Sequence, residues 1–261
     1  MATGGATIDG ATPAIQADQI GKSFGAVQAL TSVNLHLRPG EILGLIGDNG
    51  AGKSTFIKIL TGFLHQDTGR IFVHGEEVRL RSVDHARSLG IETVYQDLAL
   101  VNEINVYHNL FLNREPLLTP LPFLHNGRMR RLAREHLMEM GVDVPSVDAP
   151  VAQLSGGQRQ SIAIARAVYS NARILLLDEP LAAMGAKEGA LIMDLLRRLK
   201  ARGDVSILMI DHNYAHVLEV CDRVNVLQHG EITFDRSVEE TSVEELTELM
   251  VEEYRRHLGG A

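Results

Sequence analysis

The stretch that decides the fold is Gly47-Asp48-Asn49-Gly50-Ala51-Gly52-Lys53-Ser54-Thr55. It matches the pattern G-x-x-x-x-G-K-[ST] and lies between an apolar run, 42–46, and a helical stretch that starts at Lys53. Glycines let backbone N–H groups turn inward as an anion-binding nest, and a helix start adds the positive end of a dipole. We therefore expect all nine residues to bind a nucleoside triphosphate, with Lys53 at the β- and γ-phosphates and the Ser54 hydroxyl on Mg²⁺.

Strand and helix signals alternate outward from this loop. Apolar runs bounded by turn residues predict strands at 15–20, 33–37, 42–46, 70–73, 91–95, 174–177, 205–210, 223–227 and 231–234. Periodic stretches predict helices at 53–64, 126–140 (with Asn126 as N-cap and Gly141 as its end), from 155, 187–201, and from 242. The alternation predicts an α/β fold with a mostly parallel sheet. We expect loose tails at 1–13 and 257–261 around one domain, 14–256, with a helical insertion at about 97–153.

Composition narrows the class of protein. The chain has 261 residues, with 25 Lys+Arg against 33 Asp+Glu, so its net charge is −8 and a nucleic-acid partner is not expected. A lone cysteine, Cys221, excludes an internal disulfide framework and a Cys-rich zinc site, and we expect it in the core. No apolar run is long enough to span a bilayer, and the opening residues do not have the pattern of a secretory signal.

Two adjacent acids follow the apolar run 174–177. Downstream of a phosphate-binding loop, an aspartate at the end of such a strand holds the Mg²⁺ shell, which is the role expected of Asp178. Glu179 is then placed to orient or deprotonate the attacking water. Without the loop upstream, the same pattern would be an ordinary strand end.

Leu154-Ser155-Gly156-Gly157-Gln158 has the spacing of a capping box. A well-capped helix start explains Ser155 and Gln158 by itself. The double glycine favours a second interpretation, because it bares backbone N–H groups at the positive end of a helix, where a phosphate can approach.

These residues resemble the ATP-binding cassette (ABC) superfamily, whose signature is LSGGQ followed about 20 residues later by the Walker B aspartate. Other matching positions are Gln96 (Q-loop), His212 (switch histidine) and Phe24 (adenine-stacking aromatic). The resemblance implies an antiparallel β subdomain beside the parallel core. It implies that Gln96 senses Mg²⁺ and water, that His212 contacts the γ-phosphate, and that 155–158 bind the ATP held by a second subunit. By themselves, His212 would be a loop histidine and Phe24 a core residue.

The stretches 90–101 and 179–188 resemble the cassettes of bacterial importers for ribose, xylose and fructose. The chain departs from that group at Leu181, Met184 and Asp211. Asp211 either raises the pKa of the neighbouring histidine or points to solvent. The resemblance implies an ATPase homodimer on the cytoplasmic face of the inner membrane, where it powers a separate sugar permease and, indirectly, serves a periplasmic sugar-binding protein.

Two alternatives stay open on function: a soluble ABC-type ATPase of translation or DNA repair, and an importer subunit for a substrate other than a sugar.

A local basic cluster at 128–134 has two interpretations. It is a contact for anionic lipid headgroups, or a solvated helix face with an i,i+4 pair between Arg131 and Glu135.

Overall fold

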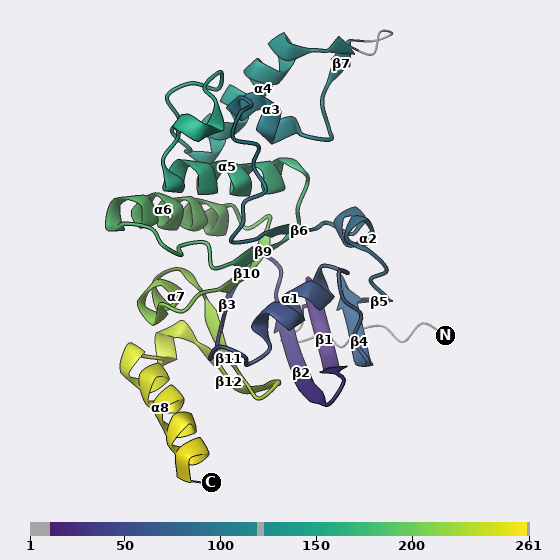
Figure 1. Ribbon diagram of the computed structural model, residues 1–261, viewed down its shortest axis with the longest axis vertical. Coiled ribbons are helices and arrows are strands. Elements are labelled where there is room, and N and C mark those ends of the chain that lie inside the picture. The colour runs from purple at the N-terminus through teal and green to yellow at the C-terminus, as the bar shows by residue number, and fades with distance from the viewer. Residues whose placement is uncertain (1–10, 119–122, 260–261) are drawn as a thin grey trace.

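A computed structural model describes residues 11–118 and 123–259 (Figure 1). The strands are β1 (Ile15–Phe24), β2 (Val27–Leu37), β3 (Ile42–Ile46), β4 (Thr68–Val73), β5 (Glu76–Val78), β6 (Ile91–Val94), β7 (Leu117–Leu118), β8 (Phe123–Leu124), β9 (Ile174–Asp178), β10 (Ser206–Ile210), β11 (Arg223–Gln228) and β12 (Glu231–Ser237). The helices are α1 (Lys53–Leu60), α2 (Val83–Ser88), α3 (Val106–Phe111), α4 (Asn126–Met140), α5 (Gly156–Tyr169), α6 (Ala186–Arg202), α7 (Tyr214–Val220) and α8 (Val243–Gly259), with 3₁₀ turns at Val151–Gln153 and Val238–Glu240. The predicted α/β class is confirmed.

The main sheet has ten strands in the order β5-β4-β1-β2-β12-β11-β3-β10-β9-β6. Strands β11, β3, β10, β9 and β6 run parallel, whereas β5, β4, β1 and β2 pair antiparallel. Strand β12 joins the two groups, because it is antiparallel to β11 and parallel to β2. The mostly parallel core and the antiparallel β subdomain are thus parts of one continuous sheet.

Both faces of the parallel strands are covered, which explains why their sequences are uninterrupted apolar runs. In β9, Leu175 and Leu177 pack into the core of helices α3 to α6, whereas Ile174 and Leu176 pack on the opposite face with α1. Successive side chains in a strand point to opposite faces, so each strand contributes to two cores. The parallel strands and the loops at their carboxyl ends are therefore held from both sides.

The helical insertion contains α3 and α4, which lie at the end of the molecule away from α8 in Figure 1. Gly141 ends α4 in a left-handed conformation, as predicted. The predicted N-cap at Asn126 is wrong by one residue, because His125 Nδ1 accepts the N–H of Arg128 and Asn126 is the first residue of the helix. The short strands β7 and β8, which pair antiparallel within this segment, were not predicted.

Several boundaries differ from the expected ones for local reasons. Helix α1 ends at Leu60 instead of continuing to 64, because Gly62 takes a positive φ of 70° after the Thr61 cap. Of the expected tails 1–13 and 257–261, residues 1–10, 260 and 261 lie outside the described residues. The described part differs from a loose tail at both ends, because Pro13 is buried and α8 continues to Gly259. None of the described helices is long and apolar enough to cross a membrane.

Candidate functional site

The phosphate-binding loop joins β3 to α1, and its glycines are required by close contacts. Gly47 has a φ of 152°, and a Cβ there would lie 2.2 Å from the carbonyl oxygen of Leu227. Gly52 has a φ of 109°, and its Cβ would lie 2.6 Å from the carbonyl oxygen of Ala29. Gly52 is also the N-cap of α1 and offers no side-chain acceptor. The first N–H groups of α1 consequently remain available to an anion.

Lys53 is 7% exposed and lies against this loop. Its Nζ donates to the carbonyl oxygens of Gly47 at 2.6 Å and Asp48 at 2.9 Å. Burial lowers the pKa of Lys53, and the nearby charges of Glu179, Asp48 and Asp178 oppose that shift. The ammonium group is therefore held inside the loop by acceptors that phosphate oxygens can replace.

Asp178 and Glu179 lie at the end of β9. Burial raises the pKa of Asp178, the charge of Glu179 raises it further, and Lys53 opposes both effects. Glu179 takes a left-handed conformation with a φ of 52° and donates its backbone N–H to the carbonyl of Ile210 at 3.0 Å. Its Oε1 lies 2.5 Å from His212 Nε2. A non-glycine residue with this φ stores strain, which is a common feature of functional sites.

These groups share one pocket with a volume of about 180 Å³. Its lining residues are Ala29, Asn49, Gly50, Gly52, Lys53, Ser54, Thr55, Asp178, Glu179, Ile210 and His212. Lysine, hydroxyl, acid and histidine groups predicted from three separate stretches of sequence are thus brought together. The pocket is smaller than the 300 Å³ or so typical of ligand sites, and is suited to the phosphate end of a nucleotide.

The residues at this pocket fit a magnesium ion. The Ser54 hydroxyl and the Asp178 carboxylate both line it, and they are hard oxygen donors of the kind that Mg²⁺ prefers. The raised pKa of Asp178 reflects a partly buried carboxylate that a cation would stabilise. No group of three or more His, Cys, Asp or Glu residues suited to a metal exists within 11–118 and 123–259.

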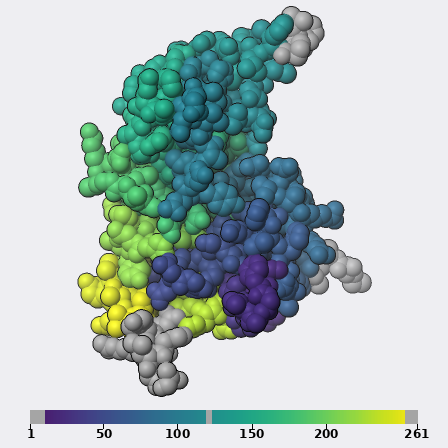
Figure 2. Space-filling view, viewed as in Figure 1, coloured from purple at the N-terminus to yellow at the C-terminus, as the bar shows by residue number. Residues whose placement is uncertain are grey.

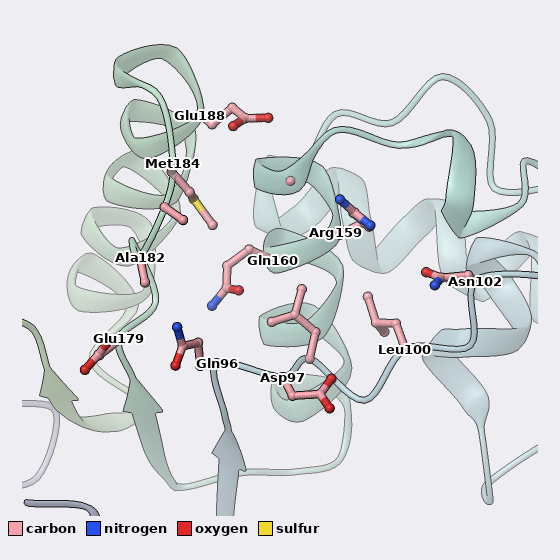
Figure 3. A pocket seen from close by; sticks show the side chains of 13 residues that line it. Gln96, Asp97, Leu100, Asn102, Arg159, Gln160, Glu179, Ala182, Met184 and Glu188 are labelled. Atoms are coloured by element: carbon pink, nitrogen blue, oxygen red, sulfur yellow. The ribbon is translucent and has the colours of Figure 1, made fainter.

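Gln96 does not line this pocket. It follows β6 and lines a neighbouring pocket of about 330 Å³, together with Gly156, Gln160 and Met184 (Figure 3). Glu179 lines both pockets. Gln96 and the phosphate site therefore have Glu179 as a common neighbour, and the predicted role of Gln96 at Mg²⁺ stays a prediction.

The capping box at the start of α5 is present as predicted. The Gln158 N–H donates to Ser155 Oγ at 3.3 Å, and the Ser155 N–H donates to Gln158 Oε1 at 3.1 Å. A Cβ on Gly157 would lie 3.2 Å from the Cα of Glu188, so close packing of α6 is a further reason for this glycine. Gly156 lines the second pocket, and none of the residues 155–158 lines the phosphate pocket.

Phe24 lies at the end of β1 and is 48% exposed. Its ring lies 5.6 Å from Lys22 Nζ and does not line the phosphate pocket. It is not a core residue. The exposed ring at the end of β1 is available to stack on a planar group.

The three departures from the sugar-importer pattern differ in their surroundings. Leu181 is 6% exposed and packs in the core, and Met184 packs partly buried against it. Asp211 is 7% exposed, so it does not point to solvent. Its Oδ1 accepts the Asn213 N–H at 2.9 Å, and its Oδ2 lies 3.6 Å from His216 Nδ1. The carboxylate thus holds the loop that carries the switch histidine.

One residue of the site region was missed in the sequence. Arg166 on α5 donates to the carbonyl oxygens of Leu98 and Ala99, each at 2.9 Å, directly after Gln96. Burial lowers the pKa of Arg166. The signal was an arginine within the apolar pattern of this helix, whose partners lie 67 and 68 residues away along the chain. Such partners are not visible in a local pattern.

The family model described as "ABC transporter" matches residues 30–182. Xylose/arabinose import ATP-binding protein XylG of Sulfolobus acidocaldarius is 46% identical over 88% of this chain and 90% of its own length. Fructose import ATP-binding protein FrcA of Rhizobium meliloti is 41% identical over 84% of this chain and 86% of its own. Ribose import ATP-binding protein RbsA of Hahella chejuensis is 40% identical over 90% of this chain, which spans 46% of that longer protein.

Among solved structures, the chain is similar to MJ1267, an ATP-binding cassette of an ABC transporter. One structure of MJ1267 has a TM-score of 0.80 and 27% identity over 93% of this chain and 98% of its own. Its ADP conformation has a TM-score of 0.76 and 25% identity over 92% and 95%. Motifs, fold and relatives agree, and we conclude that the chain belongs to the ATP-binding cassette family of ABC transporters.

Proposed function

We propose that this chain binds and hydrolyses Mg-ATP to energise the import of a carbohydrate through a membrane permease. The observation that carries the proposal is the convergence of Lys53, Ser54, Asp178, Glu179 and His212 on one pocket. In-line attack of water on a γ-phosphate requires a lysine, two oxygen donors for a metal, and an acid beside a histidine.

Each side chain of the pocket has its own role in binding or hydrolysis of ATP. Lys53 and the first N–H groups of α1 bind the phosphates, and Lys53 exchanges its carbonyl partners in the loop for phosphate oxygens. Ser54 and Asp178 hold Mg²⁺, which supplies charge neutralisation at the phosphates when bound. Glu179 orients the attacking water and accepts its proton, and His212, 2.5 Å from Glu179 Oε1, fixes that carboxylate and reaches toward the γ-phosphate.

Two copies of the chain complete the site. Residues 155–158 lie outside the phosphate pocket, and yet they present a glycine-rich helix start whose dipole favours an anion. In a head-to-tail homodimer each copy offers this helix start to the ATP of the other copy, so that two ATP molecules are enclosed between them. Phe24 stacks on adenine, and Gln96 responds to hydrolysis through Glu179.

The carbohydrate assignment is supported by relatives named for the import of xylose/arabinose, ribose and fructose. We infer a monosaccharide as substrate. The permease contacts the region of Gln96 on the cytoplasmic face of the membrane, and a periplasmic binding protein supplies the sugar. ATP binding shifts the assembled transporter between two states, and hydrolysis resets it.

The test is Glu179→Gln, which removes the water-orienting carboxylate and keeps the shape. With Mg-ATP this variant is expected to form a stable dimer with two bound nucleotides in light scattering, with hydrolysis lowered by 10²-fold or more. Glu244→Gln, on the exposed start of α8, is the matched control and should behave as the parent chain. A Glu179→Gln variant that stays monomeric with ATP bound would contradict the homodimer.

A second experiment addresses the substrate. The chain is co-purified with candidate sugar permeases in nanodiscs, and ATP hydrolysis is measured as each sugar-loaded binding protein is added. Stimulation by a pentose- or hexose-loaded binding protein is expected. Capture of ribosomes or DNA in place of a permease would instead favour an ATPase of translation or DNA repair.

A further inference from the structure

The hairpin of β7 and β8 carries four exposed apolar side chains. Leu117, Leu118, Phe123 and Leu124 are 51%, 41%, 63% and 44% exposed, and the two strands pair with each other. Figure 1 places β7 at one end of the longest axis and α8 at the other. Folded chains rarely gather exposed apolar side chains in this way unless the surface contacts something.

A basic helix face begins directly after this hairpin. Helix α4 buries Met129, Ala133, Leu137 and Met140, and it exposes Arg128, Arg131 and Arg134 on other sides. Residues 114–134 contain five arginines and one acidic residue, in a chain with a net charge of −8. The segment 114–134 therefore carries a net positive charge within an acidic chain.

The arginines are available to another partner. Within 11–118 and 123–259, the Arg128 side chain forms no ion pair. Arg131 lies 3.8 Å from Glu135, and Arg134 lies 3.5 Å from Asp148, with more than half of each arginine side chain exposed. Exposed pairs at such distances contribute little to stability, so they exchange readily for stronger anions.

We propose that Leu117, Leu118, Phe123, Leu124, Arg128 and Arg131, hereafter the hairpin surface, contact an anionic lipid bilayer directly. The apolar side chains enter the boundary between headgroups and acyl chains, and the arginines bind lipid phosphates. Apolar burial and positive charge are each weak anchors, and together they suffice for reversible binding. This contact goes beyond the proposed function, because it requires neither ATP nor a permease.

Shape and charge favour a lipid surface over a protein partner. The described part of this segment projects from the body of the molecule in Figure 2. A projecting tip offers a rigid partner little area, whereas a bilayer deforms around it. The rest of the chain is acidic and is repelled by anionic lipid, so the net charge favours an approach by the segment 114–134.

The experiment is flotation of the full chain with vesicles, without nucleotide. Vesicles of phosphatidylcholine are compared with vesicles that also contain phosphatidylglycerol. Binding is expected only to the second kind and is expected to weaken as salt rises. Arg128→Ala with Arg131→Ala should lower the affinity about fivefold for each arginine. Leu118→Ser with Phe123→Ser should lower it by about tenfold.

Matched controls use exposed residues elsewhere. Phe63→Ser removes a side chain that is 65% exposed, and Arg236→Ala removes an exposed arginine from β12; neither should change binding. ATP hydrolysis and thermal unfolding should be unchanged in all four variants. Equal binding of the parent chain and both hairpin variants would overturn the proposal. Loss of a concentration-dependent dimer by Phe123→Ser in sedimentation without vesicles would also overturn it, in favour of a contact between copies.

Discussion

Replacement of Arg223 by methionine tests a buried ion network that joins the two halves of the sheet. Arg223 begins β11, and its side chain is 6% exposed. Its Nε lies 2.8 Å from Glu41 Oε1, its Nη1 2.6 Å from Asp235 Oδ1, and its Nη2 2.5 Å from the carbonyl oxygen of His36. The network therefore ties the entrance of β3 to β12 and β2.

The loss of stability in Arg223→Met follows from the carboxylate that remains buried after the arginine is removed. Glu41 has a side chain that is only 4% exposed, and without the guanidinium it is a buried charge without its main partner. Loss of one member of a buried pair costs about 3–5 kcal/mol. Unfolding 261 residues releases about 0.55 kcal/mol/K of entropy. The midpoint of thermal unfolding should therefore fall by about 5–9 °C.

The assay is calorimetry beside a matched control on the neighbouring strand. Arg236→Met removes an arginine whose side chain is 53% exposed and which lies 2.9 Å from Glu245, so it should shift the midpoint by less than about 2 °C. Glu41→Gln combined with Arg223→Met should recover part of the loss, because the stranded charge is gone. Equal shifts for Arg223→Met and Arg236→Met would refute the reasoning.

Two further predictions concern the switch loop and the core thiol. Asp211→Ala should lower kcat for ATP hydrolysis about tenfold with KM nearly unchanged, because the 2.9 Å hydrogen bond from the Asn213 N–H is lost. Asp211→Asn keeps an acceptor for that N–H and should keep most of the rate. Equal losses of kcat in the two variants would contradict this role of Asp211. Burial raises the pKa of Cys221 above its ordinary value of about 9, so above that pH only the unfolded chain loses the proton. The free energy of unfolding should then fall by about 1.4 kcal/mol per pH unit relative to Cys221→Ala, measured with urea; parallel profiles would contradict it.

The sheet could be predicted because its strands are buried on both faces. Runs such as 42–46 and 174–177 contain only apolar residues and glycine, and they end at turn or acidic residues, so their bounds are visible locally. The start of α5 was equally clear, since a capping box is a contact between residues three apart. Strands β7 and β8 escaped prediction because two residues each carry no periodicity and their side chains pack against no core.

The site was predicted where a motif fixes its own geometry. The glycines of the loop 47–55 fix its backbone locally, and Asp178 and Glu179 follow β9, which is separated from β3 only by β10 and brings both acids to the same pocket. The alternative that Asp211 points to solvent was wrong, because its surroundings depend on distant segments. Asp211 is buried, with His216 Nδ1 of α7 3.6 Å from its Oδ2, and a polar side chain after a strand gives no local sign of that.

Glu179 lies between the phosphate site and the site of Gln96. It lines the phosphate pocket, and it lines the pocket of Gln96 and Gly156, so any movement that reshapes the second pocket changes the surroundings of the water-orienting carboxylate. Arg166 binds the loop after Gln96 to α5, the helix that carries Gly156 at its start. These two hydrogen bonds tie the segment after Gln96 to the signature helix. If a second subunit meets Gly156 and a permease meets Gln96, as proposed above, both act on hydrolysis through this one carboxylate.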